Sequence, residues 1–413
     1  MRILFVVDGR SPIALNWMDY FIQGGHEVHL ASTFSCEPPG EIASFQVTPV
    51  AFSGAKRPSP LSPLPRGEGV TPANGQTRGG GKPAGKSFLW SAGLVGFRTR
   101  VRQWLGPLTF AKAGRRLAQV IQQVRPDIIH AMRIPYEGII ASLALEQLPQ
   151  PQPPLLISVW GNDFTLHAAA TPWMAAYTRK ALHKAGALHT DCYRDQRLAY
   201  QWGFQESRPA VVLPGGGGVQ MDLFCPPSRD DLRGSVVINP RGVRAYVRND
   251  TFFKSIPRVL DKFPSTRFIC TTMAGEPQAL RWRAELGIGQ AVDLLPRQTR
   301  VEMAALFRQA QVIVSPSTHD GTPNTLLEAM ACGCYPVVGD LESLREWITP
   351  SVNGALVDPA DERALAEAVC EALGNPELRR KAAAHNLSLV AERAEYGKVM
   401  REAERFYRRI VGS

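Results

Sequence analysis

An acidic residue in the segment HDGTPNTLLEAMACGCYP (residues 319–336) stands where an apolar helix is predicted. Glu328 lies inside the run LLEAMACG, where burial of an unpaired carboxylate would be unfavourable. A second acid, Asp320, comes eight residues earlier, just before the Gly-Thr-Pro turn that leads into the same helix. Both carboxylates therefore need partners, and their position beside one helix N-terminus indicates what kind of partner fits.

The start of this helix is a predicted anion site. Its first backbone N–H groups have no partner within the helix and the helix dipole is positive there, so phosphate binds well. Asn324 and Glu328, four residues apart, share one face of the helix. A carboxylate one turn below the phosphate can accept hydrogen bonds from the vicinal hydroxyls of a ribose, and Asp320 could accept from a second sugar. The pattern favours a diphosphate flanked by sugars. The alternative is that Glu328 is a structural acid bonded to backbone amides.

The segments that must position these residues alternate between short β-branched runs and helical patterns, which is typical of parallel α/β sheets. Helices are predicted between the strands, including one over 361–373 that Asp361 could cap and a last one at about 390–410. The predicted strands are 3–7, 28–31, 127–130, 155–159, 187–190 and 211–213 in the first half, and 236–239, 267–271, 292–295, 312–315 and 335–338 in the second.

The length of 413 residues exceeds the size at which one core usually keeps growing, so two domains are expected. Four successive glycines in LPGGGGVQMDLFCPP would suit a hinge, although a flexible surface loop is the alternative. The predicted units are an N-terminal domain at 1–213, a hinge at 214–227, a C-terminal domain at 228–388, and a terminal helix at 389–413 that packs back on the N-terminal domain.

Composition narrows the class of protein. A chain that is 44% hydrophobic and 20% charged is typical of a globular protein, and no apolar run approaches the roughly 18 residues that span a bilayer. The opening MRILFVVDGRSP lacks the cleavage site of a signal peptide. Seven cysteines without a CxxC pair argue against a disulfide framework or a zinc site, and there is no Asp-x-Asp metal motif. We expect a cytoplasmic protein without a metal.

The net charge of +10 is concentrated in two stretches. Residues 54–86 are basic, rich in Pro and Gly and poor in large apolar side chains, so a disordered insertion is expected. Residues 97–121 interleave Arg and Lys with Phe, Trp and Leu. They could dock on anionic lipid at the inner face of the cell membrane, or form a solvated helix face. No nucleic-acid partner is expected, because no binding motif accompanies the charge.

Several segments together resemble the family 4 retaining glycosyltransferases. SPSTHDGTPNTLLEAMACGCYPVVGD is similar to the donor-site motif of that family, in which two acids with seven residues between them precede an AMACG-like helix and a PVV strand. VNGALVDPADERALAEAV, LPGGGGVQMDLFCP, GGHEVHLAS and PDIIHAMR also resemble family segments, so the resemblance covers most of the chain outside 54–86. It implies the GT-B fold, an α/β architecture in which two Rossmann-like, doubly wound parallel-sheet domains face each other across a cleft.

The resemblance also implies a function. A hexose would pass from a nucleoside-diphosphate sugar to a hydroxyl of a glycan or lipid-linked acceptor, with retention of configuration, in the synthesis of cell-surface polysaccharide or glycolipid. No cofactor and no protein nucleophile are expected. Two alternatives stay open: a GT-B nucleotide-sugar epimerase, which consumes donor without acceptor, and a non-catalytic relative that binds a sugar nucleotide or glycan. A dinucleotide dehydrogenase is disfavoured, because no GxGxxG follows a strand.

The resemblance also implies site residues, wherever a position of this sequence matches a position of the family motif. Arg241 matches the family arginine that neutralises the leaving diphosphate, but no lysine stands five residues later, so Arg244 or Arg248 would supply the second charge. Asp320 replaces the usual Glu, and Trp160 stands where a His is common. His130 lies at a predicted strand end, and the alternative to a ligand contact is that this histidine is structural. The predicted catalytic residues are Arg241, Arg248, Asp320 and Glu328; the donor-binding residues are Gly9, Arg244, Gly321, Thr322, Pro323, Asn324 and Thr325; the acceptor-side residues are Arg10, His130, Trp160, Asn162 and Asp163.

Overall fold

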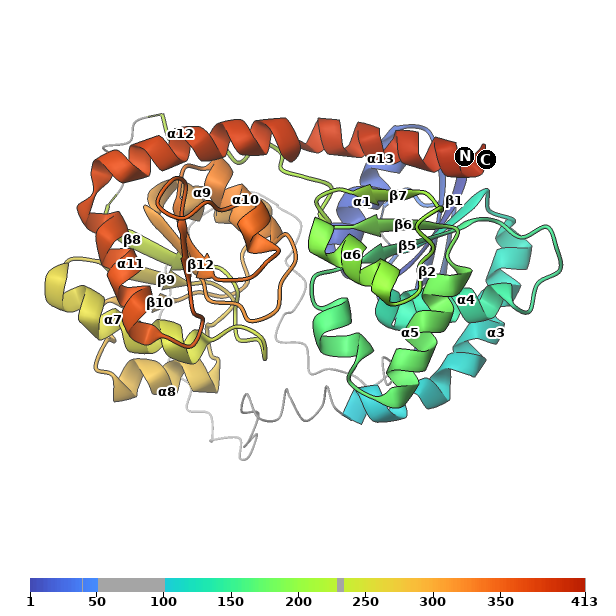
Figure 1. The fold of residues 1–413 in the computed structure, drawn as a ribbon, viewed down its shortest axis with the longest axis horizontal. Helices are drawn as coiled ribbons and strands as arrows, with labels where there is room; N and C mark the ends of the chain where they lie inside the picture. Colours follow the sequence, from blue (N-terminus) through green and yellow to red (C-terminus); the bar gives the residue numbers. More distant parts are fainter. Residues whose placement is uncertain (39, 51–100, 229–233, 413) are drawn as a thin grey trace, which may run out of the picture.

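Two parallel sheets organise the chain, whose computed structural model describes residues 1–38, 40–50, 101–228 and 234–412. Figure 1 shows the two halves side by side, with the last two helices running along the top of both. Each sheet separates two apolar layers, so helices cover both of its faces. The predicted insertion at 54–86 and residues 97–100 of the basic stretch lie outside the described residues.

The first sheet has seven strands in the order β3-β2-β1-β4-β5-β6-β7. Its strands are β1 (Arg2–Val7), β2 (Glu27–Ser32), β3 (Ser44–Val47), β4 (Ile128–Ala131), β5 (Leu155–Val159), β6 (Ala187–Thr190) and β7 (Ala210–Val212). Its helices and short helical turns are α1 (Pro12–Gln23), α3 (Pro107–Val124), η1 (Ile134–Gly138), α4 (Ile139–Leu145), η2 (Asp163–Ala168), α5 (Pro172–Lys184) and α6 (Tyr193–Gln201). The six predicted strands are present within about one residue. The sequence prediction missed β3, a partly exposed edge strand without the apolar run of a buried one.

The second sheet has six strands in the order β10-β9-β8-β11-β12-β13. Its strands are β8 (Val236–Asn239), β9 (Arg267–Cys270), β10 (Val292–Leu294), β11 (Val312–Ser315), β12 (Tyr335–Gly339) and β13 (Ala355–Val357). The remaining helices are α7 (Asn249–Lys262), α8 (Pro277–Glu285), α9 (Arg300–Gln309), α10 (Asn324–Ala331), η4 (Leu344–Glu346), α11 (Glu362–Gly374), α12 (Pro376–Arg393) and α13 (Tyr396–Val411). Asp361 caps α11 as predicted, because its carboxylate accepts from the N–H groups of Arg363 and Ala364.

Both sheets reverse their strand order at one point, between β1 and β4 in the first and between β8 and β11 in the second. Ligands of open parallel sheets bind outside the carboxyl ends of the strands at such a point. The loops after β1, β4, β8 and β11 are therefore the places where the fold positions functional side chains.

The last helix, predicted at about 390–410, begins at Tyr396, because α12 ends at Arg393 and the helical conformation is interrupted between the two helices. Glu395 accepts hydrogen bonds from the N–H groups of Gly397 and Lys398 and starts α13, while Val219 pairs with the chain between α12 and α13. Tyr407 and other apolar residues of α13 pack on the first sheet beside Phe5. The carboxyl-terminal helix thus crosses from the second half of the chain to the first (Figure 1).

The glycines of the linker at 214–227 allow it to pack closely against α1 and the start of α10. Gly215, Gly216 and Gly217 are buried, and a Cβ on Gly216 would lie 2.4 Å from Asn324 Nδ2 at the start of α10. The linker is also tied to α1, because Trp17 Nε1 donates to Gly215 O at 3.0 Å and Asn16 Nδ2 to Gly216 O at 2.6 Å. The glycines therefore allow the two domains and the linker to meet at one point.

Candidate functional site

A cavity of about 590 Å³ lies between the carboxyl ends of the two sheets. Of the seven buried side-chain atoms that lack a hydrogen-bond partner in the described part of the chain, five belong to residues that line it. Unpartnered buried polar groups are rare in folded proteins, and each calls for an explanation. These five atoms are Arg102 Nε, Glu137 Oε2, Asp191 Oδ1, Arg241 Nε and Thr325 Oγ1. Their concentration marks the cavity as a binding site.

The N-terminus of α10 opens into this cavity. Its N-cap is Pro323, and no side chain caps the helix. Thr322, Pro323, Asn324 and Thr325 line the cavity, whereas Gly321 packs beside it. Uncapped N–H groups and the positive helix end are the features on which the predicted anion site depends.

Arg241 and Asp320 face each other beside that helix end. Arg241 Nη2 lies 2.6 Å from Asp320 Oδ2, and both side chains are largely buried while lining the cavity. Arg244 also lines the cavity and donates to the hydroxyl of Tyr246 at 2.8 Å. Arg248 lies elsewhere: it is paired with Asp250 at 2.8 Å and does not line the cavity. The structure therefore brings two of the three predicted arginines to the cavity into which α10 opens.

Glu328 lies one turn below Asn324 and is not among the cavity-lining residues. Its carboxylate forms no hydrogen bond within the described ranges, so backbone amides do not hold it. Burial raises the pKa of Glu328 to about 7, although the nearby charge of Arg300 opposes the shift. A half-buried carboxyl with one cationic neighbour and no hydrogen-bond donor is the unusual feature that the sequence indicated.

Arg10, Trp160 and Asn162 line the other side of the cavity. Arg10 is held by Asp8 at 2.8 Å, and Gly9 between them is buried. Asp163 lies below this surface, fully buried, and accepts from Arg133 Nε at 2.8 Å and from the N–H of Trp160 at 3.0 Å. Asp163 therefore supports the cleft wall without facing the cavity.

His130 is not on the acceptor side, so its predicted placement there needs correction. Its side chain is fully buried and hydrogen bonded to Ser158 Oγ at 2.7 Å and to the hydroxyl of Tyr407. Burial holds the pKa of His130 well below its usual value. His130 lies within β4, where α13 covers it, and the side chain joins that helix to β5.

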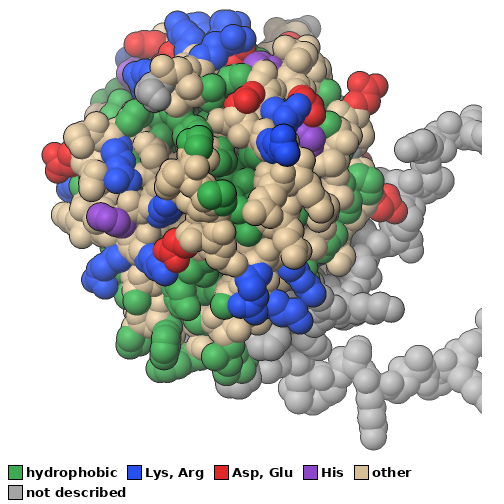
Figure 2. Space-filling view, turned by 90° about the vertical axis from the view of Figure 1, so that its right-hand side faces the viewer, with side chains coloured by type: hydrophobic (Ala, Val, Ile, Leu, Met, Phe, Trp, Pro, Cys, Tyr) green, Lys and Arg blue, Asp and Glu red, His purple; other side chains and the backbone are tan. Residues whose placement is uncertain are grey.

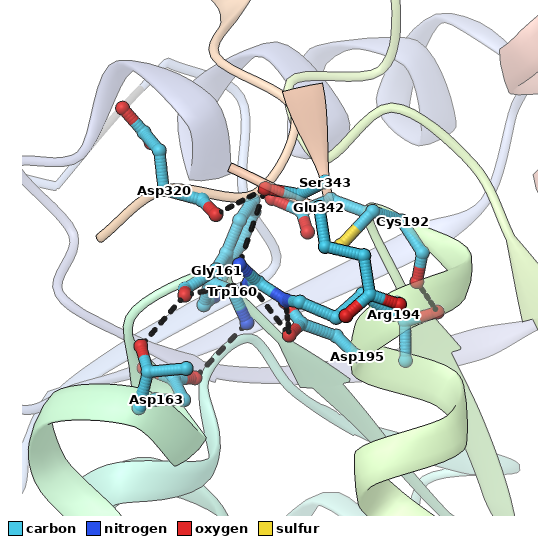
Figure 3. A network of polar contacts seen from close by, with 12 residues as sticks. Trp160, Gly161, Asp163, Cys192, Arg194, Asp195, Asp320, Glu342 and Ser343 are labelled. Atoms are coloured by element: carbon cyan, nitrogen blue, oxygen red, sulfur yellow. Dashed lines mark hydrogen bonds and ion pairs between the residues drawn. The ribbon is translucent and has the colours of Figure 1, made fainter. Parts of the chain in front are cut away.

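A network of polar contacts joins the two domains at the back of the cleft (Figure 3). Arg194 donates to Gly161 O at 2.8 Å and to Ser343 Oγ at 3.1 Å, and Ser343 Oγ donates to Asp320 O at 2.7 Å. Glu346 accepts from the N–H groups of Tyr193 and Arg194 at the start of α6. The donor-side loop that carries Asp320 is thus held by residues of the first domain.

Two glycines, Gly161 and Gly321, lie at a tight contact between the domains. A Cβ on Gly161 would lie 1.7 Å from the backbone N of Gly321, and a Cβ on Gly321 would lie 2.2 Å from Asp191 Oδ1. Neither position has room for a side chain. The structure is therefore a closed arrangement that these glycines permit.

Sequence reasoning missed eight cavity-lining residues with polar side chains, which are Asp8, Ser11, Arg102, Arg133, Tyr136, Glu137, Asp191 and Tyr246. Several of them could have been found from strand ends. Arg133 and Glu137 follow β4 and Asp191 follows β6, and the carboxyl ends of parallel strands supply ligand contacts.

Asp191, Cys192 and Asp195 bring three potential metal ligands within 4.8 Å of one another. The guanidinium of Arg194 already bonds Asp195 Oδ1, at 2.9 Å from Nε and 2.7 Å from Nη2. Burial and the charge of Asp195 raise the pKa of Asp191 well above its usual value. Because Arg194 already occupies Asp195 and burial disfavours the charged form of Asp191, these residues fit a structural role at the domain interface better than a metal site.

Two protein-family models match the chain. The model described as "Glycosyl transferase 4-like domain" matches residues 14–215, and the model described as "Glycosyl transferases group 1" matches residues 242–375. Each match falls on one of the two sheets.

The chain is also similar to curated proteins. The D-inositol 3-phosphate glycosyltransferase of Mycolicibacterium smegmatis is 30% identical over 191 residues, and that of Mycobacterium sp. (strain KMS) is 31% identical over 194 residues. Each match covers 43% of this chain and 43% of the relative, so the chain spans less than half the length of these relatives.

Among solved structures, sucrose-phosphate synthase from Thermosynechococcus elongatus superposes with a TM-score of 0.70 at 15% identity, covering 100% of both chains. Anabaena HepE in complex with UDP gives 0.67 at 13% identity, covering 98% of this chain and 99% of that one. The likeness confirms the predicted GT-B fold of two parallel-sheet α/β domains. At these identities it concerns the fold alone.

Proposed function

Because the chain belongs to the group 1 glycosyl transferases, we propose that it transfers a hexose from a nucleoside-diphosphate sugar to a hydroxyl acceptor, with retention of configuration. The main support is the uncapped N-terminus of α10, which opens into the cleft beside Arg241. The diphosphate would bind at this helix end, and the ribose would lie one turn below, at Glu328.

In the proposed step the bond between the anomeric carbon and the leaving phosphate breaks, and the acceptor oxygen bonds to the same face of that carbon. The proton of the acceptor hydroxyl passes to the departing phosphate oxygen, so no protein nucleophile takes part. Arg241, with Arg244 beside it, stabilises the charge that develops on the diphosphate. Closure of the domains at Gly161 and Gly321 excludes water from the reaction.

A panel of nucleotide sugars tests the donor, with thermal stabilisation as the first readout and release of nucleoside diphosphate as the second. UDP-glucose is the first probe, because HepE has been crystallised with it. Polyol phosphates are the first acceptors, because the curated relatives are named for one. Stabilisation and acceptor-dependent release support transfer, whereas donor consumption at an unchanged rate without acceptor would indicate an epimerase. Equal rates with EDTA and with Mg²⁺ would support a metal-independent reaction.

We also propose that the N-terminal domain contacts anionic membrane at the cytoplasmic face, beside lipid-linked acceptors in cell-surface glycan synthesis. None of the helices in the described ranges has the length and apolar character needed to cross a bilayer. Trp104, Leu105 and Leu108 are 58%, 44% and 79% exposed, and Arg115 and Arg116 are exposed on the same segment. Figure 2 shows hydrophobic side chains gathered at the lower end of this domain, with Lys and Arg beside them.

Vesicle binding tests the membrane contact. Wild-type protein is expected to co-sediment with phosphatidylglycerol vesicles and to be released by salt, since the attraction is partly electrostatic. The variant Trp104→Ser/Leu108→Ser should bind less, and the matched pair Val301→Ser/Val352→Ser, which removes two exposed apolar side chains of the second domain, should bind as wild type does. Equal binding by all three proteins would refute the contact.

A further inference from the structure

Glu137 is a buried acid on the acceptor side of the cleft. It lines the cavity, and its side chain belongs to a residue that is only 4% exposed. Oε1 accepts a hydrogen bond of 2.7 Å from Thr33 Oγ1, whereas Oε2 has no hydrogen-bond partner among the residues described. Half of the hydrogen-bonding capacity of this carboxyl is therefore unused within the protein.

The fold places Glu137 beside the carboxyl end of β1. Thr33 follows β2 and Glu137 follows β4, and these strands flank β1, which leads into Asp8 and Arg10. Tyr136, immediately before Glu137, has φ 73° and ψ −68°, a conformation that is unfavourable for a bulky residue. Such strain persists only where the surroundings enforce it, and it is common at ligand sites.

Gly138 fixes the other side of Glu137. Its N–H donates to Arg133 O at 2.8 Å, and a Cβ there would lie 3.2 Å from that oxygen. The turn is thus closed on both sides of the acid, and the carboxyl has little freedom to leave the cavity wall.

Guanidinium groups determine what this carboxyl can bind. Arg133 and Arg102 both lie close enough to oppose the rise in the pKa of Glu137, which burial nevertheless raises to about 7. Arg133 is paired with Asp163, but Arg102 stacks 4.1 Å over the ring of Tyr136 and its Nε has no partner among the described residues. This positive surrounding disfavours an amine or another cation. A hydroxyl can bind to the Glu137 carboxyl in this surrounding, and the nearby guanidinium groups favour an acidic substituent on the same ligand.

We propose that Glu137 binds a hydroxyl of the acceptor, and that the acceptor is a sugar or polyol whose other substituents are neutral or acidic and not cationic. This inference rests on the proposed glycosyl transfer. Glu137 would orient the acceptor, while the departing phosphate takes the proton of the attacking hydroxyl. Arg102 lies where it can contact an acidic substituent on the same molecule.

Steady-state kinetics of Glu137→Gln and Glu137→Ala test the proposal. The donor is whichever nucleotide sugar stabilises the wild-type protein most, and the acceptor probes are glucose, glucose 6-phosphate, glucosamine and myo-inositol 3-phosphate. Release of nucleoside diphosphate is also followed with water as the acceptor. Glu146→Gln is the matched control, because Glu146 lies in the same domain in an exposed ion pair with Lys180.

We expect Glu137→Ala to lower kcat/KM for the acceptor at least about tenfold, the loss of one hydrogen bond in a buried site. The donor KM and the stabilisation by donor should stay within about twofold of wild type. Glu137→Gln should lose less, because an amide still bonds a hydroxyl, and it carries the test if the alanine variant fails to fold. Glucosamine should be the poorest acceptor of the four.

Acceptor kinetics within about twofold of wild type in both Glu137 variants would overturn the inference and leave the proposed function standing. A preference for glucosamine over glucose 6-phosphate would overturn the acceptor class. If the wild-type protein neither binds nor cleaves any nucleotide sugar, the proposed function fails, and the inference fails with it.

Discussion

The guanidinium of Arg241 lies 2.6 Å from the carboxylate of Asp320, and the pair stands beside the uncapped N-terminus of α10. Both side chains are at least 86% buried. Asp320 therefore holds a cation at the point where the helix end also attracts negative charge. The Nε of Arg241 has no partner in the described part of the chain and remains able to donate. This arrangement suits a site that must stabilise a departing diphosphate.

Arg241→Ala is expected to lower kcat by about 10²–10³-fold, because a preorganised donor to the developing charge is lost. Arg241→Lys should recover part of the rate, since it keeps the charge but not the fork of donors. Arg248→Ala is the matched control: Arg248 is paired with Asp250 outside the cavity lining, so we expect a loss below about threefold. Comparable losses in Arg241→Ala and Arg248→Ala would show that the assignment of the leaving-group cation is wrong.

Gly161→Ala should prevent full closure of the domains. The added Cβ would lie 1.7 Å from the backbone N of Gly321, so the domains would have to separate. We expect kcat to fall at least about tenfold and the radius of gyration from small-angle X-ray scattering to rise. Gly186→Ala, whose Cβ would have no neighbour nearer than 3.7 Å, should behave as wild type. A fully active Gly161→Ala protein would mean that catalysis does not need this closed arrangement.

Glu346→Ala should weaken closure through a different contact. Glu346 accepts from the N–H groups of Tyr193 and Arg194 at 3.0 and 3.1 Å, so the second domain caps a helix of the first. Loss of a cap costs about 1–2 kcal/mol, which predicts a decrease in transfer rate of roughly fivefold to thirtyfold. Glu342→Ala removes only an exposed pair with Arg197 and should change the rate little. Equal rates for the two variants would count against the cap as a closure contact.

The sequence predicted the strands that are buried runs of apolar residues, because their pattern reflects burial on both faces of a parallel sheet. It missed β3 and β13 (Ala355–Val357), which are short and lie at sheet edges. The helix start at α10 was predictable because a helix N-terminus after a strand is a local feature. Glu137 and Asp191 follow strand ends, which places them near the site, but their burial and their neighbours distant in sequence, which single them out there, cannot be predicted from local sequence. His130 shows the opposite case, in which a strand-end position is covered by a helix nearly 280 residues away.

The pKa of Glu328, which burial raises to about 7, predicts a pH dependence of stability. A carboxyl with a raised pKa in the folded protein contributes stability that is complete below its unfolded value, near 4.5, and is lost as the pH rises to about 7. Glu328→Gln lacks this titration. We therefore expect the variant to gain stability relative to wild type, on the order of 1–2 kcal/mol, between pH 4.5 and 7, and no further gain above pH 7. Thermal or urea unfolding without ligand measures the difference, and a difference that does not change with pH would contradict the buried state of Glu328.

The affinity of the wild-type protein for its donor should increase with pH, whereas the stability contribution of Glu328 decreases. Hydroxyl donors stabilise the ionised carboxylate, so affinity for a nucleotide sugar should rise as the pH increases through about 7. A nucleotide sugar is the appropriate ligand, because the terminal phosphate of a free nucleoside diphosphate itself titrates near pH 6. Glu328→Gln should bind more weakly and without this pH dependence. Calorimetric titration between pH 6 and 8 measures both proteins, and parallel curves would exclude Glu328 from the binding site.

A crystal structure with the best-stabilising nucleotide sugar tests the central claim most directly. The account predicts a diphosphate at the N-terminus of α10 within hydrogen-bond distance of Arg241, and a ribose whose two hydroxyls donate to Glu328. A nucleotide bound elsewhere, or bound here with Glu328 turned away from the ribose, would contradict it.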